Sequence, residues 1–342
     1  MDGFTQGALG AAVTQAFYGE RLGRWALPIG WFAGMLPDAD IFIRNSADPL
    51  WGWTFHRTVT HGLAFIPIGA LLACLPFLLA RSLRPRWREV YGAAFVAYAT
   101  HAPLDAATTY GTVLLWPFDD LRVSWDLIGI IDPIFTLLLL VGVIFSTRRR
   151  STGPARVGVA LAALYLVLCV IQHERAVDVQ AALVESRSHE VRAARVVPTV
   201  INIVLYRSVY MTDDGYIYAD ALRVPFLGPD TIRIGDSAPV FDPVAEGVYS
   251  GAVNPERLRR DLSRFAWFTD GYWARTLGNP QLIGDMRITG DPAMLAPLWG
   301  ISIDPLQQVP VTRGDGAGRD TSAVGALWRE IWGLDERHVP AP

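Results

Sequence analysis

The feature that most constrains this chain is the uneven distribution of its apolar residues. Long apolar runs fill the first half and end near residue 173, whereas Arg, Asp and Glu are interspersed through the second half. Overall, 51% of the residues are hydrophobic and 18% are charged, whereas soluble domains carry about 25% charged residues. We therefore expect two parts, one embedded in a membrane and one soluble.

The apolar runs predict a mainly α, polytopic membrane domain. A helix needs about 20 apolar residues to span a bilayer, so the first run is expected to be a short, tilted or re-entrant helix, and the last is also short. We count four to six membrane helices among the runs 5–19, 25–43, 62–80, 91–115, 128–145 and 157–171. The expected domains are a helical membrane domain at 1–173, a connecting helix at 174–195 and a soluble α+β domain at 196–342.

The soluble part shows both β and α signals. Alternating residues on either side of the Asp213-Asp214-Gly215 turn predict a β-hairpin. Asn254-Pro255 supplies an N-cap and a first-turn proline for a helix that runs to about Trp267.

Two arginine clusters set the expected topology. The loops around residues 81–88 and 148–156 are the most basic segments between apolar runs, and the positive-inside rule places both in the cytoplasm. The chain is then a multi-pass protein of the bacterial inner (cell) membrane, with the candidate site and the C-terminal domain on the extracytoplasmic side. The net charge of −3 gives no attraction to nucleic acid, and the oligomeric state stays open.

Histidines and aspartates in the apolar half indicate a metal site. His56, His61 and His101 occur there with Asp38, Asp40 and Asp105, and ionisable groups within membrane segments are usually functional. On a helix, His101 and Asp105 lie on one face, within reach of a shared cation.

The remaining candidate ligands come from loops at the membrane margin. His56 and His61 are five residues apart, so both can reach one ion, or two adjacent ions, only if His56 precedes the helix. Asp38 and Asp40 are two hard oxygen donors that can cap the cation from the other side. We expect Arg57 to contact an anionic oxygen, with a membrane anchor as its alternative role, and we select Asp126 as the candidate base.

This donor set predicts metal-assisted hydrolysis. A His and Asp set without thiolates suits a divalent metal, zinc first, with manganese or iron as alternatives. One or two ions would generate hydroxide near neutral pH. The expected substrate is a phospholipid or another anionic, membrane-associated phosphoester, although an ester or amide is also compatible.

The order of these motifs resembles the YdjM-like family of membrane-bound metal-dependent hydrolases over about residues 5–145. The motifs are GMLPDAD at 34–40, HRTVTHG at 56–62, HAPLDAATTYG at 101–111 and LWPF at 115–118. The resemblance implies a membrane metal hydrolase. His101 and Asp105 with the upstream ligands are more distantly similar to zinc-dependent phospholipase C, but that group's later His and Glu ligands are missing.

Two other functions fit the same residues. A non-catalytic scaffold would use a structural metal to tie helices together and would leave no open coordination position. An ion or proton transporter would need polar groups through the full depth of the membrane.

Overall fold

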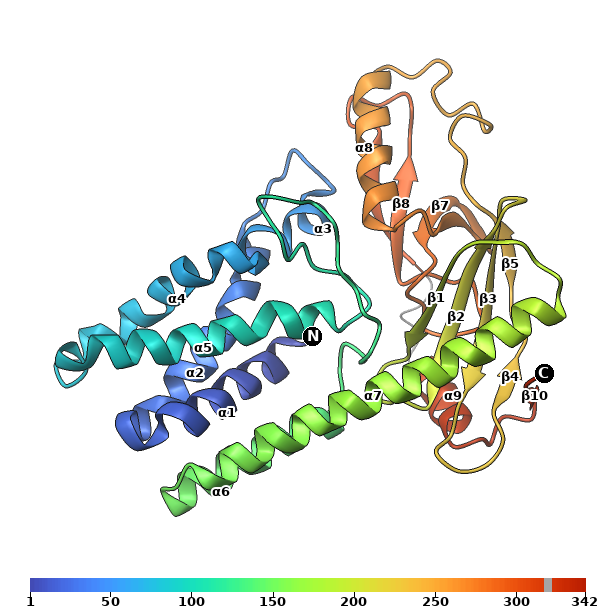
Figure 1. The fold of residues 1–342 in the computed structure, drawn as a ribbon. Helices are drawn as coiled ribbons and strands as arrows, with labels where there is room; N and C mark the ends of the chain where they lie inside the picture. Colours follow the sequence, from blue (N-terminus) through green and yellow to red (C-terminus); the bar gives the residue numbers. More distant parts are fainter. Residues whose placement is uncertain (317–321) are drawn as a thin grey trace. The chain divides into compact units, whose positions relative to one another are not determined.

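The computed structural model describes residues 1–316 and 322–342 and divides into two compact units (Figure 1). The N-terminal unit comprises residues 1–44 and 55–171. The C-terminal unit comprises residues 45–54 and 172–342. The chain therefore passes between the units at residues 44/45, 54/55 and 171/172.

The N-terminal unit is a helical bundle. Its helices are α1 (Gly3–Leu22), α2 (Ala26–Met35), α4 (Ile66–Cys74), α5 (Trp87–Ala106), α6 (Pro133–Arg149) and the first part of α7 (Gly153–Ser186). Short 3-10 helices connect them, including η2 (Leu36–Phe42), η3 (Val59–His61) and η5 (Leu75–Leu79). Helix α1 packs against α2, α5 and α6, and α5 packs against α1, α2 and α4.

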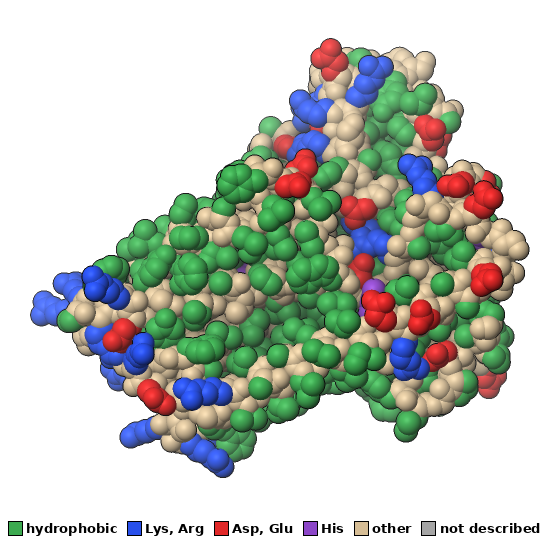
Figure 2. Space-filling model, viewed as in Figure 1, with side chains coloured by type: hydrophobic (Ala, Val, Ile, Leu, Met, Phe, Trp, Pro, Cys, Tyr) green, Lys and Arg blue, Asp and Glu red, His purple; other side chains and the backbone are tan. Residues whose placement is uncertain are grey.

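Small residues form the core of this bundle. Ala26, Ala33, Ala93 and Ala97 are fully buried between α2 and α5. Large apolar side chains instead point outward and cover much of the face of this unit that Figure 2 draws. Arginines gather at helix ends, as in the last turn of α6.

The expected polytopic domain of four to six membrane helices is wrong. Among the described residues, only α7 is long and apolar enough to cross a membrane. A second span arises only if the bent pair Trp51–His61 and Leu63–Leu79, with its 56° bend, counts as one. The multi-pass topology and the orientation in the membrane therefore stay predictions.

Breaks in the apolar runs explain this error. Helices α2 and α4 have 10 and 9 residues, about half the length that a span needs. Each continues into a 3-10 segment with proline at its start, Pro37 or Pro76. Helix α5 has 20 residues but carries charged and polar side chains at both ends.

The C-terminal unit contains two antiparallel sheets. The first has the order β1-β2-β3-β4-β10, with β5 also paired to β3; the second has the order β6-β7-β8-β9. The first sheet comprises β1 (Val191–Pro198), β2 (Leu205–Thr212), β3 (Tyr216–Arg223), β4 (Thr231–Arg233), β5 (Ser237–Pro239) and β10 (Val339–Pro340). The second comprises β6 (Trp273–Thr276), β7 (Asn279–Asp285), β8 (Trp299–Ile303) and β9 (Val311–Asp315).

The described part of this unit also contains helices. The second half of α7 packs on the first sheet through Ala176, Val179 and Leu183 (Figure 1). Helices α8 (Pro255–Phe268) and α9 (Ser322–Ile331) follow later in the chain. The predicted hairpin is β2-β3, and Asn254 caps α8 through the backbone N–H of Arg257.

The segment 45–54 joins the C-terminal unit although its flanking residues belong to the bundle. Trp53, in the short helix α3 (Trp51–Phe55), stacks on Phe268 with ring centroids 5.4 Å apart. The Arg313 guanidinium lies 4.2 Å from the centroid of the Trp53 ring. Arg264 forms two hydrogen bonds with the Asp48 carboxylate, of 3.0 and 2.8 Å.

Candidate metal centre

Three separate segments of the bundle supply the candidate ligands. Helix α5 carries His101 and Asp105 one turn apart and continues through Pro103 to Ala106. The 3-10 helix η2 carries Asp38 and Asp40, and η3 ends at His61. The structure brings the six predicted ligands into two groups that share His61: Asp38, His61, His101 and Asp105, and Asp40, His56 and His61.

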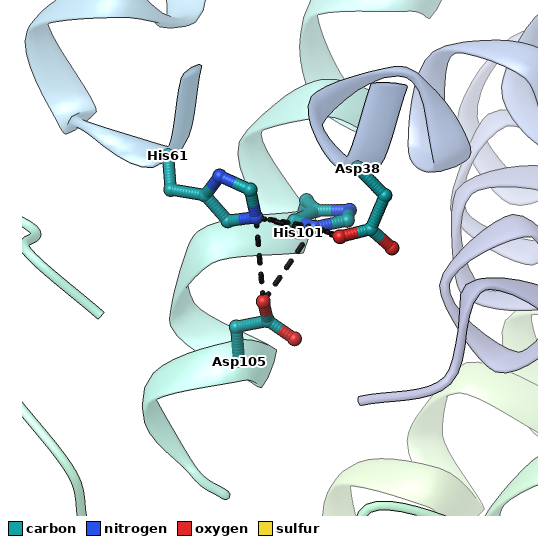
Figure 3. A group of neighbouring side chains, drawn as sticks. All are labelled: Asp38, His61, His101 and Asp105. Atoms are coloured by element: carbon teal, nitrogen blue, oxygen red, sulfur yellow. Dashed lines mark hydrogen bonds and ion pairs between the residues drawn. The ribbon is translucent and has the colours of Figure 1, made fainter. Parts of the chain in front are cut away.

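The first group has the spacing of ligands around one ion (Figure 3). The Nε2 atoms of His61 and His101 are 3.0 Å apart. Asp38 Oδ1 lies 3.6 and 3.4 Å from these two nitrogens, and Asp105 Oδ2 lies 3.4 and 3.7 Å from them. Ligand bonds of 2.0–2.2 Å at tetrahedral angles separate ligand atoms by about 3.3 Å, so the four atoms fit one small divalent cation.

When the two imidazoles are neutral, their hydrogen bonds leave both Nε2 atoms as acceptors. His101 Nδ1 lies 2.6 Å from the Gly34 carbonyl oxygen, so Nδ1 must donate. Thr60 donates its hydroxyl proton to Asp40 Oδ2 over 2.8 Å, so the same hydroxyl accepts from His61 Nδ1 at 2.9 Å. In this neutral form the two Nε2 lone pairs, 3.0 Å apart, face each other and repel, and a proton or a metal cation between them removes the repulsion. Metal-binding histidines usually donate their other N–H in this way.

Asp105 directs one carboxylate oxygen, Oδ2, toward the Nε2 atoms of His61 and His101. Its Oδ1 accepts from Gln6 Nε2 at 2.9 Å and pairs with the Met1 amino group. Its Oδ2 is buried and takes no hydrogen bond of normal geometry. Burial would raise the pKa of Asp105, but the Arg57 guanidinium, 3.0 Å from Oδ2, and the neighbouring histidines hold it well below its usual range. The carboxylate is therefore ionised and can bind a cation.

Asp40 and His56 lie beside the first group and contact each other. Asp40 Oδ1 is 2.6 Å from His56 Nδ1, and the Arg57 N–H donates to Asp40 Oδ2 at 3.4 Å. His56 Nε2 lies 4.0 Å from Asp38 Oδ1. Both Asp40 oxygens are thus engaged by neighbouring residues, so Asp40 orients His56 and, through Thr60, His61.

The two predicted catalytic residues adopt left-handed backbone conformations. The φ angles of Arg57 and Asp126 are 64° and 53°, and such strain in residues other than glycine clusters at functional sites. Arg57 donates to Thr108 Oγ1 at 3.1 Å, and its guanidinium lies 5.0 Å from the centroid of the Tyr110 ring. Arg57 therefore holds Asp105 in place.

Asp126 belongs to neither candidate metal group. The N–H groups of its neighbours Trp125 and Leu127 donate to the carbonyls of Ala106 and Ala107. Its loop is thus attached to the C-terminal end of α5, and the Asp126 side chain is buried.

Sequence reasoning missed the residues that support the ligands. Gln6, Thr60 and the Gly34 carbonyl each orient a ligand side chain. Gln6 offered a signal, because it is a polar residue inside an apolar run. Thr60 lies within the His56–His61 motif, but nothing in the sequence indicates its bond to Asp40.

A pocket of about 810 Å³ opens beside the ligands. Asp38, His56 and Arg57 provide its polar lining. Apolar residues of α2 and η2 form most of the remaining wall, among them Leu27, Trp31, Phe32, Met35, Ile41 and Phe42.

Comparison with known proteins identifies one family. No curated protein and no solved structure matches this chain significantly, and the likeness to zinc-dependent phospholipase C stays an expectation from the motif. The model of the YdjM inner membrane protein family matches residues 1–176, which include every candidate ligand. Because this match covers more than half of the chain, the protein belongs to the YdjM inner membrane protein family.

Proposed function

We propose that this protein is a membrane-bound metal-dependent hydrolase that acts on a phospholipid or another membrane-associated phosphoester. Asp38, His61, His101 and Asp105 would hold one divalent ion, zinc first, with manganese or iron as alternatives. Such an ion lowers the pKa of a bound water to near neutrality and supplies a nucleophile. The arginine clusters of the sequence favour an extracytoplasmic site.

The surrounding residues have distinct roles in this proposal. Arg57 fixes Asp105, and Asp40 fixes His56 and, through Thr60, His61. The His56 Nε2 atom is the ring nitrogen not bound to Asp40, and His56 lines the pocket. It is therefore placed to hold a proton next to a substrate. Asp126 remains the proposed base, because its loop is attached to the end of the helix that carries Asp105.

The observation that carries the proposal is the one-sided exposure of the ligand group. His61, His101 and Asp105 have fully buried side chains, whereas the Asp38 side chain is 22% exposed and lines the pocket. Structural metal sites are closed, whereas catalytic sites keep a coordination position for water or substrate. The pocket gives water and substrate access to the ligand group on the Asp38 side, and this access favours catalysis over the scaffold alternative.

Metal content and turnover test this proposal together. The full chain would be purified in detergent and compared with His101→Ala, Asp105→Asn and the control His173→Ala, whose ring contacts a backbone carbonyl of β1 instead. We expect one ion per chain in the parent and in the His173→Ala control. The metal affinity of both site variants should fall at least tenfold. Only the parent and the control should hydrolyse a short-chain phospholipid.

Two results would contradict the proposal. Stoichiometric metal without hydrolysis of any phosphoester would favour the scaffold. A chain that binds no divalent ion after reconstitution, although its circular dichroism shows a folded protein, would exclude the metal centre.

A further inference from the structure

We infer that the pocket beside the candidate metal centre binds one acyl chain of an amphiphilic phosphoester, with the phosphate next to His56, Arg57 and the ion that Asp38 would help to hold. This inference rests on the proposed function and names the substrate class of the same site. It predicts that a water-soluble phosphoester without a chain is a poor ligand.

The wall of the pocket is almost entirely apolar. Its lining residues are Met1, Gly3, Leu27, Pro28, Trp31, Phe32, Met35, Leu36, Asp38, Ala39, Ile41, Phe42, His56, Arg57 and Ile130. Only Asp38, His56 and Arg57 carry charged or titratable side chains. A soluble sugar or nucleotide phosphate would leave its own polar groups without hydrogen-bond partners against such a wall. A hydrocarbon chain has no polar groups, so it can lie against this wall without losing hydrogen bonds.

Asp38, one of the polar lining residues, lies just beyond the C-terminal end of α2. Leu27 and Met35 lie eight residues apart on α2, which separates them by about 12 Å along the helix axis. Asp38 follows Met35 in η2. The α2 wall is therefore apolar along its length and leads to the ligands, as a linear amphiphile with one polar end requires.

The wall is held in place by packing. Trp31 contacts the ring of Phe4 edge-on, with centroids 5.1 Å apart. A β-carbon at Gly7 would lie 2.8 Å from the Trp31 ring, so the glycine is what lets Trp31 pack closely against α1. Because Trp31 is fixed between these residues, the pocket is formed before a ligand enters. Its volume of about 810 Å³ lies within the usual range for ligand sites.

The rim of the pocket offers a path from a bilayer. Phe32, Met35, Ile41 and Phe42 line the pocket and are 39%, 39%, 53% and 75% exposed. Exposed large apolar side chains around a pocket mark a lipid or protein interaction surface. The family is one of inner membrane proteins. An acyl chain that leaves the bilayer can therefore enter the pocket across these apolar side chains.

The test uses alkyl phosphates from butyl to dodecyl phosphate as ligands. Binding would be measured on the metal-loaded full chain in amphipol, by competition with dodecyl phosphate that carries a photoreactive group at the chain end. We expect the affinity to rise about fourfold per methylene until the pocket is full. The photoreactive group should label α2 near Leu27.

Two matched substitutions test where the acyl chain lies. Leu27→Trp fills the pocket at the end far from the ligands, and Leu71→Trp makes the same change at an exposed position of α4 outside the pocket. Leu27→Trp is expected to weaken dodecyl phosphate binding about tenfold or more, yet leave butyl phosphate binding unchanged. Leu71→Trp should change neither, and elemental analysis should find the parent's metal content in both.

The outcomes separate the inference from the proposed function. Equal affinities for butyl and dodecyl phosphate, or equal effects of the two substitutions, would overturn the acyl-chain site and leave the hydrolase proposal in place. A second result would support the acyl-chain site but overturn the phosphoester function. In it, the affinity for alkyl phosphates rises with chain length and falls in Leu27→Trp, but neither inorganic phosphate nor metal removal changes it.

Discussion

Thr60 shows how a single hydroxyl can set the properties of a metal ligand. It donates to Asp40 and accepts from His61 Nδ1, so it fixes which nitrogen of His61 is free to bind an ion. The bond between His101 and the Gly34 carbonyl does the same for the second imidazole. The orientation of both rings therefore depends on partners that are not ligands themselves.

The Thr60 variants test this dependence. Thr60→Val keeps the shape of the side chain but removes the hydroxyl, and we expect metal affinity to fall about 10- to 100-fold. Thr60→Ser retains the hydroxyl and should stay close to the parent. Competition with a chelator of known affinity measures both. Equal metal affinities for the Val and Ser variants would show that the hydroxyl does not orient His61.

The sequence predicted the residue types of the centre. It did not predict which of these residues face the ion and which orient other ligands. His and Asp stood out because such groups are rare in apolar runs, and the structure places all six close together. Which carboxylates face the ion depends on hydrogen bonds between distant segments. Asp40 reaches His56, 16 residues away, and Asp105 reaches Gln6, 99 residues away, and no local spacing encodes these contacts.

At the scale of helices, glycines control how closely α1 and α2 approach. A β-carbon at Gly10 would lie 2.3 Å from the Gly30 carbonyl oxygen and 2.9 Å from Gly34 Cα. The backbones can therefore touch only without side chains at this point. The contact also supports the centre, because the Gly34 carbonyl accepts the proton of His101.

Adding one methyl group at Gly10 should push α1 and α2 apart. Gly10→Ala is expected to destabilise the chain by about 3 kcal/mol and to weaken metal binding, because the Gly34 carbonyl must move. Gly153→Ala, at the first residue of α7, is the control, since its β-carbon would meet only Ser151 Oγ at 3.6 Å. Denaturant unfolding in detergent measures both. The proposed coupling would be wrong if Gly10→Ala unfolded at the same denaturant concentration as Gly153→Ala.

The same packing explains why helix counting from the sequence failed. Hydropathy reports that residues avoid water, but it does not distinguish a lipid environment from the core of a bundle. The alanines of α2 and α5 are buried by protein, and prolines divide the apolar runs into short helices. The β2-β3 hairpin and the start of α8 were predictable because turn and capping signals are local.

At the scale of the whole chain, the segment 45–54 is part of the C-terminal unit through both aromatic and ionic contacts. Burial would raise the pKa of Asp48, but the bonds and charge of Arg264 outweigh it and lower this pKa below its usual value. A lowered folded-state pKa gives stability that is present above the unfolded-state value, near 3.9. This stability is lost as the pH falls through the folded-state pKa.

Acid should therefore weaken the attachment of this segment. Below about pH 4 we expect the parent chain to lose about 0.5–1 kcal/mol from this pair, whereas Asp48→Asn is less stable at neutral pH and loses less on acidification. Denaturant unfolding at a series of pH values measures the difference. Asp213→Asn, in the turn between β2 and β3, is the control. An Asp48→Asn chain with the same pH dependence as the parent would show that the ion pair contributes nothing.

The attachment of residues 45–54 also dictates an order of events during biosynthesis. Asp48 precedes its partner Arg264 by 216 residues, and translation at 5–20 residues per second puts about 10 to 40 seconds between them. Trp53 therefore leaves the ribosome well before Phe268 and Arg313, which cover its ring. The C-terminal unit can close its core only around a segment that was made long before, so the environment of Trp53 is completed only after residues up to Arg313 have been synthesised.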